Sequence, residues 1–398
     1  MNAIVLQCGG PSPVLNASLW GVISACQGNP AIAELWGARS GWRGLIDGQW
    51  VALTAYRNQG RLRLETQPGA ALGSGRDRLS DEELPVALAH FQQYRISLVF
   101  VIGGNGSMAA AHKLYEYTRH VGYRVDGIPL RIIGVPKTID NDLSGCDFAP
   151  GYGSAANFIA RTTYDVSLDL STMRGFDDVA VMEVMGRHTG WLAAAAGLAR
   201  LDQDSAPHLI LLPEVPFDEE GFLSTVRQYH TQNGTCLVVT AEGVREPSGE
   251  FLAEKTQNLE RDKSGQKLLS YTGGASSYLA GLVINRLGLR SRQIRPDTIQ
   301  RSSRNLTSQV DRKWAIQTGF AAVEAGLDNN SDVMVSLVRR IQEPEWDLAL
   351  LPLNEIAGRE KPLPPNFIGP AFDVTPAFLA YARPLIDDWQ PEVISPLF

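Results

Sequence analysis

Short apolar runs alternate with amphipathic or alanine-rich stretches along most of the chain. The apolar runs predict strands at Ala3–Leu6, Leu98–Ile102, Ile132–Val135, Val179–Val184, Leu209–Leu212 and Leu237–Thr240. The stretches between them predict helices at Asn16–Cys26, Met108–Arg119 and Trp191–Leu201. Most of these strands end in a polar or glycine-containing turn. This order of strand, turn and helix predicts an α/β fold with parallel sheets, whose ligands gather at the carboxyl ends of the strands.

The turn after the run Ile132–Val135, residues 136–142, holds the largest set of candidate catalytic groups, and we call it the polar turn. It reads Pro-Lys-Thr-Ile-Asp-Asn-Asp and ends at Asp142, so a cation, a hydroxyl and two carboxylates share one short segment. Phosphoryl transfer needs a base for the acceptor's proton, a ligand for Mg²⁺ and positive charge beside the migrating group. The alternative is a loop with an Asx turn, because Asp and Asn cap turns in many proteins.

Two glycine-rich turns follow other predicted strands. Gly9-Gly10 comes after the first strand, and Gly103-Gly104-Asn105-Gly106-Ser107 comes after the run Leu98–Ile102. Glycine lets backbone N–H groups approach a phosphate at a helix N-terminus. Neither turn has the spacing of a Rossmann fingerprint or a Walker A loop. The alternatives are tight turns without a ligand and, for Ser107, a cap of the following helix.

The remaining candidates are charged residues near strand ends. Arg76 stands in a glycine-rich loop and can clamp a phosphate in bidentate fashion. Met185-Gly186-Arg187 and Glu242 each follow an apolar strand. A spaced cationic set that suits a sugar-phosphate dianion consists of Arg292, Arg295, Arg301 and Arg304. The alternatives are a solvated surface charge for Arg76, Glu242 and the cationic set, and a core side chain for Met185.

Composition narrows the class of protein. The chain has 398 residues, 44% of them apolar, which predicts a large core and two or three compact units. The net charge of -7 and the lack of a long Lys/Arg block exclude a nucleic-acid partner.

No apolar run reaches membrane-spanning length, and the N-terminus lacks the basic start of a signal peptide. Four scattered cysteines predict a reduced, cytoplasmic protein with mostly buried free thiols, and the histidine spacing predicts no zinc site. Pro362–Pro365 is interpreted as a surface tail segment.

These motifs resemble the phosphofructokinase family, sugar-phosphate kinases that use ATP or pyrophosphate. The resemblance runs from about Ile4 to about Ala322. It rests on Gly-Gly-Pro-Ser-Pro-Val-Leu-Asn-Ala-Ser, Pro-Lys-Thr-Ile-Asp-Asn-Asp, Pro-Gly-Tyr-Gly-Ser-Ala-Ala and Met-Glu-Val-Met-Gly-Arg-His-Thr-Gly-Trp-Leu-Ala. It implies two doubly wound, Rossmann-like lobes with the active site in the cleft between them. Residues 1–142, completed by part of 296–398, would bind the phosphoryl donor, and residues 143–295 would bind the sugar phosphate.

The resemblance implies a role for each candidate residue. Asp140 is expected to be the base that deprotonates the 1-hydroxyl of the sugar, with Lys137 and Thr138 beside it, and Mg²⁺ is expected at Asp142 and Asn105. Contacts to the phosphoryl donor are expected from Gly10, Arg76, Gly104, Gly106 and Ser107. Contacts to the sugar are expected from Met185, Gly186, Arg187 and Glu242. The 6-phosphate is expected at Arg292 and Arg301, across a subunit contact of a homodimer or homotetramer.

Two positions bear on the phosphoryl donor. Lys137 stands where ATP-dependent bacterial forms usually have glycine and pyrophosphate-dependent forms have lysine, and its ammonium can supply charge stabilisation that a nucleotide's extra contacts would otherwise provide. Gly106 instead favours ATP as the donor, because many pyrophosphate-using forms carry aspartate at this position and glycine leaves room for a nucleotide. The sequence around Asn105 resembles a pyrophosphate-dependent branch. We therefore expect transfer from pyrophosphate to fructose 6-phosphate, giving fructose 1,6-bisphosphate, with ATP as the alternative donor.

Three departures from the family pattern keep other functions open. Asn105 replaces the more usual aspartate, Asp178 stands where many relatives have a phosphate-binding arginine, and Thr298 stands where many have histidine or tyrosine. An acid at 178 would repel a 6-phosphate, so sedoheptulose 7-phosphate or an unphosphorylated polyol is an alternative acceptor. A non-catalytic regulatory or ligand-binding subunit is a further alternative, although the intact segment from Thr138 to Asp142 argues against it.

Overall fold

The computed structural model describes residues 1–54, 56, 61–75, 77, 79–202, 204–256, 260–261, 267, 269, 273–340 and 346–392. The chain divides into two compact units. Unit 1 comprises Met1–Ser154 and Arg301–Lys361, and unit 2 comprises Ala155–Gln300 and Pro362–Phe398. The chain therefore passes between the units at 154/155, 300/301 and 361/362, whereas the sequence-based division was drawn after residues 142 and 295.

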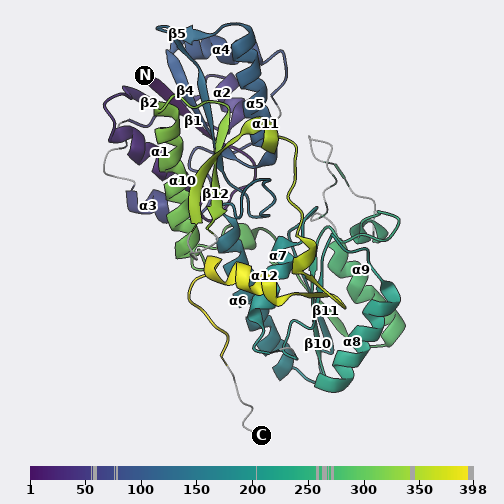
Figure 1. The fold of residues 1–398 in the computed structure, drawn as a ribbon. Helices are drawn as coiled ribbons and strands as arrows, with labels where there is room; N and C mark the ends of the chain where they lie inside the picture. The colour runs from purple at the N-terminus through teal and green to yellow at the C-terminus, as the bar shows by residue number, and fades with distance from the viewer. Residues whose placement is uncertain are drawn as a thin grey trace. The chain divides into compact units, whose positions relative to one another are not determined.

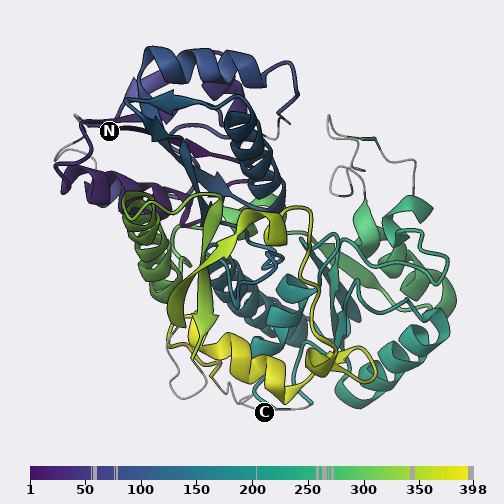
Figure 2. The same ribbon diagram turned by 45° about the horizontal axis from the view of Figure 1, so that its top comes forward.

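Among the described residues, unit 1 holds a sheet of seven strands in the order β13–β12–β7–β4–β1–β2–β3 (Figure 1). Its strands are β1 (Asn2–Gln7), β2 (Glu34–Ala38), β3 (Trp50–Ala52), β4 (Ile96–Gly103), β7 (Arg131–Pro136), β12 (Val333–Arg339) and β13 (Trp346–Pro352). The strands from β12 to β2 run parallel, while β13 and β3 are antiparallel edge strands. Figure 2 shows β12 and β13 as the yellow-green pair at one edge. A separate hairpin pairs β5 (Arg124–Val125) with β6 (Ile128–Pro129).

Helices cover both faces of this sheet. They are α1 (Leu15–Gln27), α2 (Trp42–Ile46), α3 (Arg61–Thr66), α4 (Leu84–Gln93), α5 (Asn105–His120), α10 (Gln309–Leu327) and α11 (Leu353–Ile356). In β1, Ala3 and Val5 pack into the core on the α1 and α10 face, and Ile4 and Leu6 pack into the core on the α4 and α5 face (Figure 1). Burial on both faces explains why these strands read as continuous apolar runs.

Unit 2 holds a parallel sheet in the order β11–β8–β10–β9. Its strands are β8 (Val179–Val184), β9 (Leu209–Leu211), β10 (Cys236–Ala241) and β11 (Ser291–Ile294), with a hairpin of β14 (Ile368–Gly369) and β15 (Asp373–Val374). Its helices are α6 (Tyr152–Thr172, which begins in unit 1), α7 (Trp191–Ala195), α8 (Glu219–Asn233), α9 (Gly274–Leu282) and α12 (Pro376–Ala382). The predicted α/β class with parallel sheets is confirmed.

Several smaller predictions can be compared with the structure. All four cysteines are free and buried, as predicted. Among the described residues, no helix combines the length and apolarity that a bilayer crossing requires. The tail interpretation of Pro362–Pro365 is wrong, because Leu363 is buried in unit 2 and its N–H donates to Glu214 at 2.8 Å. The helix predicted at Trp191–Leu201 is shorter, since α7 gives way to a 3-10 turn at Ala196–Ala199.

Candidate active site

The carboxyl ends of β1, β4 and β7 lie side by side in unit 1. Strand pairing continues to their last residues, with Gln7 opposite Ile102 and Gly103 opposite Pro136. Beyond the strands, the Lys137 N–H donates to the Gly103 carbonyl at 3.0 Å. The two glycine-rich turns and the polar turn therefore meet at one edge of this sheet, as the pattern of strands and turns predicted.

Lys137 joins the polar turn to the first glycine-rich turn. Its Nζ donates to the Gly10 carbonyl at 2.7 Å, and the residue is only 4% exposed. Gly9 has a left-handed φ of 81°, and a Cβ there would lie 3.1 Å from the lysine Nζ, so glycine leaves room for the ammonium. The Gly9 N–H in turn donates to the Gly75 carbonyl at 2.9 Å. Arg76, the next residue, lies outside the described residues.

The polar turn is held by its own side chains. Thr138 Oγ1 donates to Asp142 Oδ1 at 2.8 Å and accepts from the Asp140 N–H at 3.0 Å. Asn141 is buried with a φ of 54°, and its Oδ1 accepts from the Ala149 N–H at 3.1 Å. Asp140 and Asp142 stay half-buried between these anchored residues. The turn therefore presents two carboxylates from a fixed backbone beside a buried lysine.

Helix α5 begins next to this turn. Gly104 precedes the helix, and the space beside Gly106 is open, since a Cβ added there meets nothing within 4 Å. Ser107 packs against Gly103, where an added Cβ would lie 2.4 Å from Ser107 Oγ. The alternative of Ser107 as a helix cap is wrong, because the helix begins at Asn105 and has no side-chain cap. The positive end of the α5 dipole therefore lies at the edge that carries Lys137.

Asn105 contacts a segment that sequence analysis did not connect to the site. Its Oδ1 accepts from the Gly358 N–H and its Nδ2 donates to the Arg359 carbonyl, both at 2.8 Å. Both ends of the amide thus bind backbone groups of one short stretch. The metal-ligand role expected for Asn105 is not tested by this geometry, but the geometry gives the residue a second role.

A buried carboxylate below the polar turn was also missed. Asp311, in the first turn of α10, accepts from the N–H groups of Gly151 and Ser154 at 2.9 Å and from the Ser154 hydroxyl at 2.5 Å. Burial raises its pKa to about 6, although these donors act in the opposite direction. Gly151 pairs with Thr138 in a β-bridge, so Asp311 supports the polar turn from beneath. A short-range motif could not reveal it, because its partners lie about 160 positions earlier in the chain.

In unit 2, the carboxyl ends of β8 and β10 bring the predicted sugar-binding residues together. The Met185 N–H donates to the buried Gln300 side chain at 3.0 Å. Gly186 has a φ of 131°, and a Cβ there would lie 2.6 Å from the Thr189 carbonyl, so the turn needs glycine. Gln300 stands in the 3-10 turn Asp297–Arg301, and Arg301 follows it directly.

The second half of this edge comes from the end of β10. The Glu242 N–H donates to the Val184 carbonyl at 2.9 Å, and the Gly243 N–H donates to the Gly186 carbonyl at 3.1 Å. A Cβ at Gly243 would lie 1.9 Å from the Arg187 carbonyl, so the two turns are in direct backbone contact. Met185, Gly186, Arg187 and Glu242 are therefore neighbours in space.

Glu183 is a buried acid that sequence analysis passed over. It is 4% exposed in the apolar strand β8, accepts from the Ser276 N–H at 2.7 Å and lies 3.7 Å from Arg295 Nε. Gly274, with a φ of 67°, starts α9 directly against it, since a Cβ there would lie 2.3 Å from the carboxylate. Burial raises the Glu183 pKa to about 7. A lone acid inside an apolar strand was the signal that could have found it.

Arg292 lies at the opposite end of the unit 2 sheet from the turns at Met185 and Glu242. It pairs with Ala180 at the start of β8, at the opposite end from Met185, and its guanidinium is 2.6 Å from the Asp177 carboxylate. The neighbouring Asp178 binds Arg290 at 2.8 Å, and this hydrogen bond lowers the Asp178 pKa to about 2. The acid that departs from the family pattern is therefore paired with an arginine of its own.

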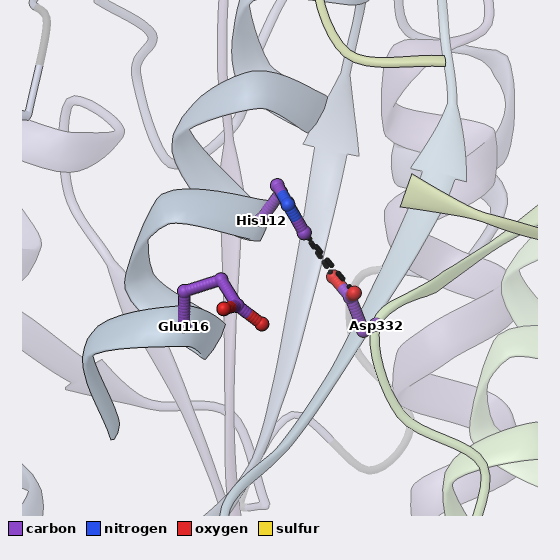
Figure 3. Close-up of side chains that lie close together, drawn as sticks. All are labelled: His112, Glu116 and Asp332. Carbon is purple, nitrogen blue, oxygen red and sulfur yellow. Dashed lines mark hydrogen bonds and ion pairs between the residues drawn. The ribbon is translucent and has the colours of Figure 1, made fainter. Parts of the chain in front are cut away.

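A further polar cluster lies at the amino end of the unit 1 sheet. Figure 3 shows His112 and Glu116, one turn apart on α5, pointing toward Asp332 just before β12. His112 Nδ1 lies 2.8 and 3.0 Å from the two Asp332 oxygens. The ligand atoms of the three residues lie within 4.8 Å of one another, and the hydrogen bond between the His112 imidazole and the Asp332 carboxylate explains the arrangement. Because Asp332 leads into β12, this cluster lies at the opposite end of the sheet from Lys137.

Comparison with known proteins gives a consistent result. The sequence model of the family described as phosphofructokinase matches residues 2–326. The chain is 36% identical to the pyrophosphate–fructose 6-phosphate 1-phosphotransferase of Xanthomonas campestris pv. campestris, over 98% of this chain and 92% of that protein. It is 33% identical to the sulfofructose kinase of Alkalicoccus urumqiensis, over 92% of each chain.

A solved structure shares the fold. The pyrophosphate-dependent phosphofructokinase of Marinobacter aquaeolei superimposes with a TM-score of 0.85 at 33% identity, covering 98% of this chain and 95% of that one. The match spans both units, and the motifs that meet at the strand ends lie inside the matched residues. The chain belongs to the phosphofructokinase family.

Proposed function

We propose that the protein catalyses Mg²⁺-dependent transfer of a phosphoryl group from pyrophosphate to the 1-hydroxyl of fructose 6-phosphate, giving fructose 1,6-bisphosphate. The observation that carries this proposal is the buried Lys137, fixed 2.7 Å from the Gly10 carbonyl beside the carboxylates of the polar turn. A lysine held at this edge can stabilise the charge of pyrophosphate without contacts to a nucleotide. The name of the Xanthomonas relative supports the same donor and acceptor.

Asp140 takes the role of general base in this proposal. Its backbone N–H donates to Thr138 Oγ1, and the residue is half-buried, so it is partly accessible to solvent and can be reached by a substrate. It removes the proton of the sugar's 1-hydroxyl as the oxygen attacks the phosphorus. Thr138 keeps the turn in shape, and Lys137 meets the negative charge of the transferred group.

The oxygen ligands at the polar turn suit Mg²⁺, which prefers carboxylates and phosphate oxygens. Asp142 would hold the ion, because one of its oxygens is oriented by the Thr138 hydroxyl at 2.8 Å. The ion would neutralise phosphate charge. The metal role expected for Asn105 stays a prediction, and its two bonds to the 358–359 backbone argue for a positioning role instead.

The remaining assignments follow the geometry of each edge. Gly10, Gly104, Gly106 and Ser107 lie at the unit 1 edge, which suits the phosphoryl donor. The turns at Met185–Arg187 and Glu242, in contact in unit 2, suit the sugar. Donor binding by unit 1 and sugar binding by unit 2 are parts of this proposal. Contacts of Arg292 and Arg301 with a 6-phosphate across a subunit contact, and a homodimer or homotetramer, stay predictions.

A second acceptor is favoured by the ion pairs at the start of β8. Asp177 and Asp178 are each only 14% exposed in their side chains and bind Arg292 and Arg290, so the cations nearest to them are already neutralised. A dianionic phosphate would gain less there than at two unpaired arginines. A ketose that carries a monoanionic or uncharged end is therefore the alternative acceptor, and the name of the Alkalicoccus relative, a sulfofructose kinase, supports this class.

A donor-and-acceptor screen on the purified protein tests the proposal. Fructose 6-phosphate, sedoheptulose 7-phosphate, sulfofructose and an unphosphorylated polyol would each be offered with pyrophosphate and then with ATP. We expect turnover with pyrophosphate and Mg²⁺, and loss of turnover when a chelator removes the metal. Turnover with ATP as donor but not with pyrophosphate would make the protein an ATP-dependent kinase. No turnover with any combination of donor and acceptor would favour the regulatory or ligand-binding subunit.

A further inference from the structure

The last residues of unit 1, 358–361, run between two parts of the candidate site, and we call them the strap. At one end, Asn105 at the start of α5 binds the strap backbone through both ends of its amide, at 2.8 Å to Gly358 N–H and 2.8 Å to the Arg359 carbonyl. Gly358 has a φ of 73°, which lets the chain turn toward the helix. The chain enters unit 2 directly after the strap.

The other end of the strap is attached to the polar turn. The Lys361 N–H donates to the Asp142 carbonyl at 2.8 Å, and Glu360 pairs with Leu143 in an antiparallel bridge. Lys361 Nζ donates to the carbonyls of Cys146 at 2.7 Å and Asp147 at 2.9 Å. The strap therefore connects the first residue of α5 to Asp142, the last residue of the polar turn. Lys137 lies near the other end of that turn in the sequence.

The chemistry of Asn105 fits this attachment. One strap group donates and the other accepts, so the residue must supply both an acceptor and a donor, and an amide does so. An aspartate would accept from Gly358 N–H but would place a charged oxygen against the Arg359 carbonyl, with no proton to share. The departure of Asn105 from the family's usual aspartate thus has a structural reason in this chain.

We propose that the strap is a positioning element for the polar turn, and that Asn105 and Lys361 are its two attachment residues. By holding the Asp142 backbone it keeps the Thr138–Asp142 hydrogen bond, and through it the Asp140 backbone, in one arrangement. This inference rests on the proposed function, because its kinetic effect is on phosphoryl transfer. A misplacement of catalytic groups by about 1 Å can cost ~10²-fold in rate, so a small loss of anchoring has a measurable consequence.

The kinetic test uses two variants that weaken one attachment each with little change in side-chain size. Asn105→Asp loses the bond to the Arg359 carbonyl, and Lys361→Met loses the two Nζ bonds while its backbone bond to Asp142 remains. We expect kcat to fall ~10-fold in each variant, with KM for donor and acceptor changed by less than ~2-fold, because only the placement of the turn is altered. Lys361→Arg should restore most of the activity. Asn366→Asp and Lys313→Met, at exposed residues of other elements, are the matched controls and should keep wild-type kcat.

A double-mutant cycle asks whether the two residues act through one element. If they do, the double variant should lose no more than ~2-fold beyond the worse single variant, since weakening either end already lets the strap shift. Multiplying losses would mean that the residues act independently and would overturn the proposal. A gain in activity, or tighter dependence on Mg²⁺, in Asn105→Asp would identify the residue as a metal ligand and would also overturn it.

Hydrogen–deuterium exchange separates this proposal from the proposed function. Peptides that cover residues 137–149 should exchange faster in both attachment variants and at the wild-type rate in both controls, whatever the enzyme's substrate is. If the attachment variants exchange faster but the wild-type protein transfers no phosphoryl group, the positioning role of the strap is supported and the proposed function is refuted. Unchanged exchange in this segment would refute the strap even if turnover were normal.

Discussion

The carboxyl edges of the two sheets organise their charged groups in different ways. In unit 1, Lys137 donates to a backbone carbonyl, and Thr138 and Asp142 bind each other within one turn. In unit 2, Glu183 lies beside Arg295. At the opposite edge of that sheet, Asp177 binds Arg292. The contacts at the unit 1 turn thus include a local hydrogen bond and a bond from Lys137 to a neutral backbone carbonyl, while these unit 2 groups form ion pairs between distant parts of the chain.

This difference teaches where charge is used for chemistry and where it is used for structure. The Gly10 carbonyl orients the Lys137 ammonium and carries no net charge that would oppose its attraction for a phosphate. The positive potential around an arginine is partly cancelled when the arginine is bound to a carboxylate. Under the proposed function we therefore expect changes in unit 1 to affect the rate of transfer, and changes in unit 2 to affect acceptor affinity or stability more than that rate.

The largest effect is expected from Asp140→Asn in unit 1. The amide cannot take the hydroxyl proton, so kcat should fall ~10³-fold, within the range for loss of a general base. Because the residue is half-buried and its backbone N–H keeps its bond to Thr138, the unfolding midpoint should stay unchanged. Steady-state kinetics and urea unfolding measure the two. Asp204→Asn, at an exposed aspartate, is the control, and near-normal turnover in Asp140→Asn would remove this residue from the mechanism.

Lys137→Met should have the next largest effect. It removes the ammonium but keeps the apolar stem, and the loss of one preorganised charge should lower kcat ~10²-fold. The Gly10 carbonyl also loses a donor, which costs about 1–3 kcal/mol of stability. Turnover with pyrophosphate is measured beside urea unfolding, with Lys313→Met as the control. If stability falls while kcat is retained, the lysine is structural and the contrast between the units disappears.

Asp177→Asn and Asp178→Asn sharpen the comparison from the unit 2 side. Arg292 is the predicted 6-phosphate contact across a subunit interface, so releasing its positive charge by removing Asp177 should lower KM for a phosphorylated acceptor ~3- to 10-fold, with kcat unchanged. Removing Asp178 releases the nearby Arg290 and should act in the same direction. KM for an unphosphorylated polyol should not change, which provides an internal control. Asp126→Asn, which breaks the exposed pair with Arg95, is the matched variant. A rise in KM would mean that the acids hold the arginines in their binding positions.

The sequence predicted those parts of the molecule that depend on neighbouring residues. The strands at Ala3–Leu6 and Ile132–Val135 were found within one residue at each end, because burial on both faces leaves a continuous apolar run. The meeting of the glycine-rich turns with Lys137 followed from the parallel arrangement, in which the carboxyl ends of strands share an edge. The family resemblance then gave roles to residues within these turns.

The parts that were missed depend on contacts between distant segments. Asp311 supports Gly151 from 160 residues away, and Asn105 binds the Arg359 carbonyl across 254 residues. No local pattern records such pairs, since each residue alone is compatible with a helix terminus or a surface position. Leu363 was placed in a tail for the same reason, because the prolines around it indicate an irregular segment but not the surface that buries it.

Glu183→Gln should have the smallest effect on turnover and a clear effect on pH-dependent stability. Burial raises the Glu183 pKa to about 7, above its usual value of 4.5, so between these values the folded protein binds a proton that the unfolded chain has released. The group's contribution to stability is therefore greatest below pH 4.5 and falls as the pH rises through 7. A shift of this size corresponds to about 3 kcal/mol.

The glutamine cannot titrate but can still accept from the Ser276 N–H, so the variant keeps the start of α9 in place. Urea unfolding of both proteins at pH 4.5, 5.5, 6.5 and 7.5 gives the difference in free energy of unfolding, in which the other titrating groups cancel. The wild type should lose stability relative to the variant as the pH rises, whereas Glu355→Gln, at an exposed glutamate, should follow the wild type. If instead the Arg295 pair dominates, the carboxylate is stabilised and the wild type gains relative stability with rising pH. The sign of the slope therefore decides whether burial or ion pairing governs the charge at the edge of unit 2.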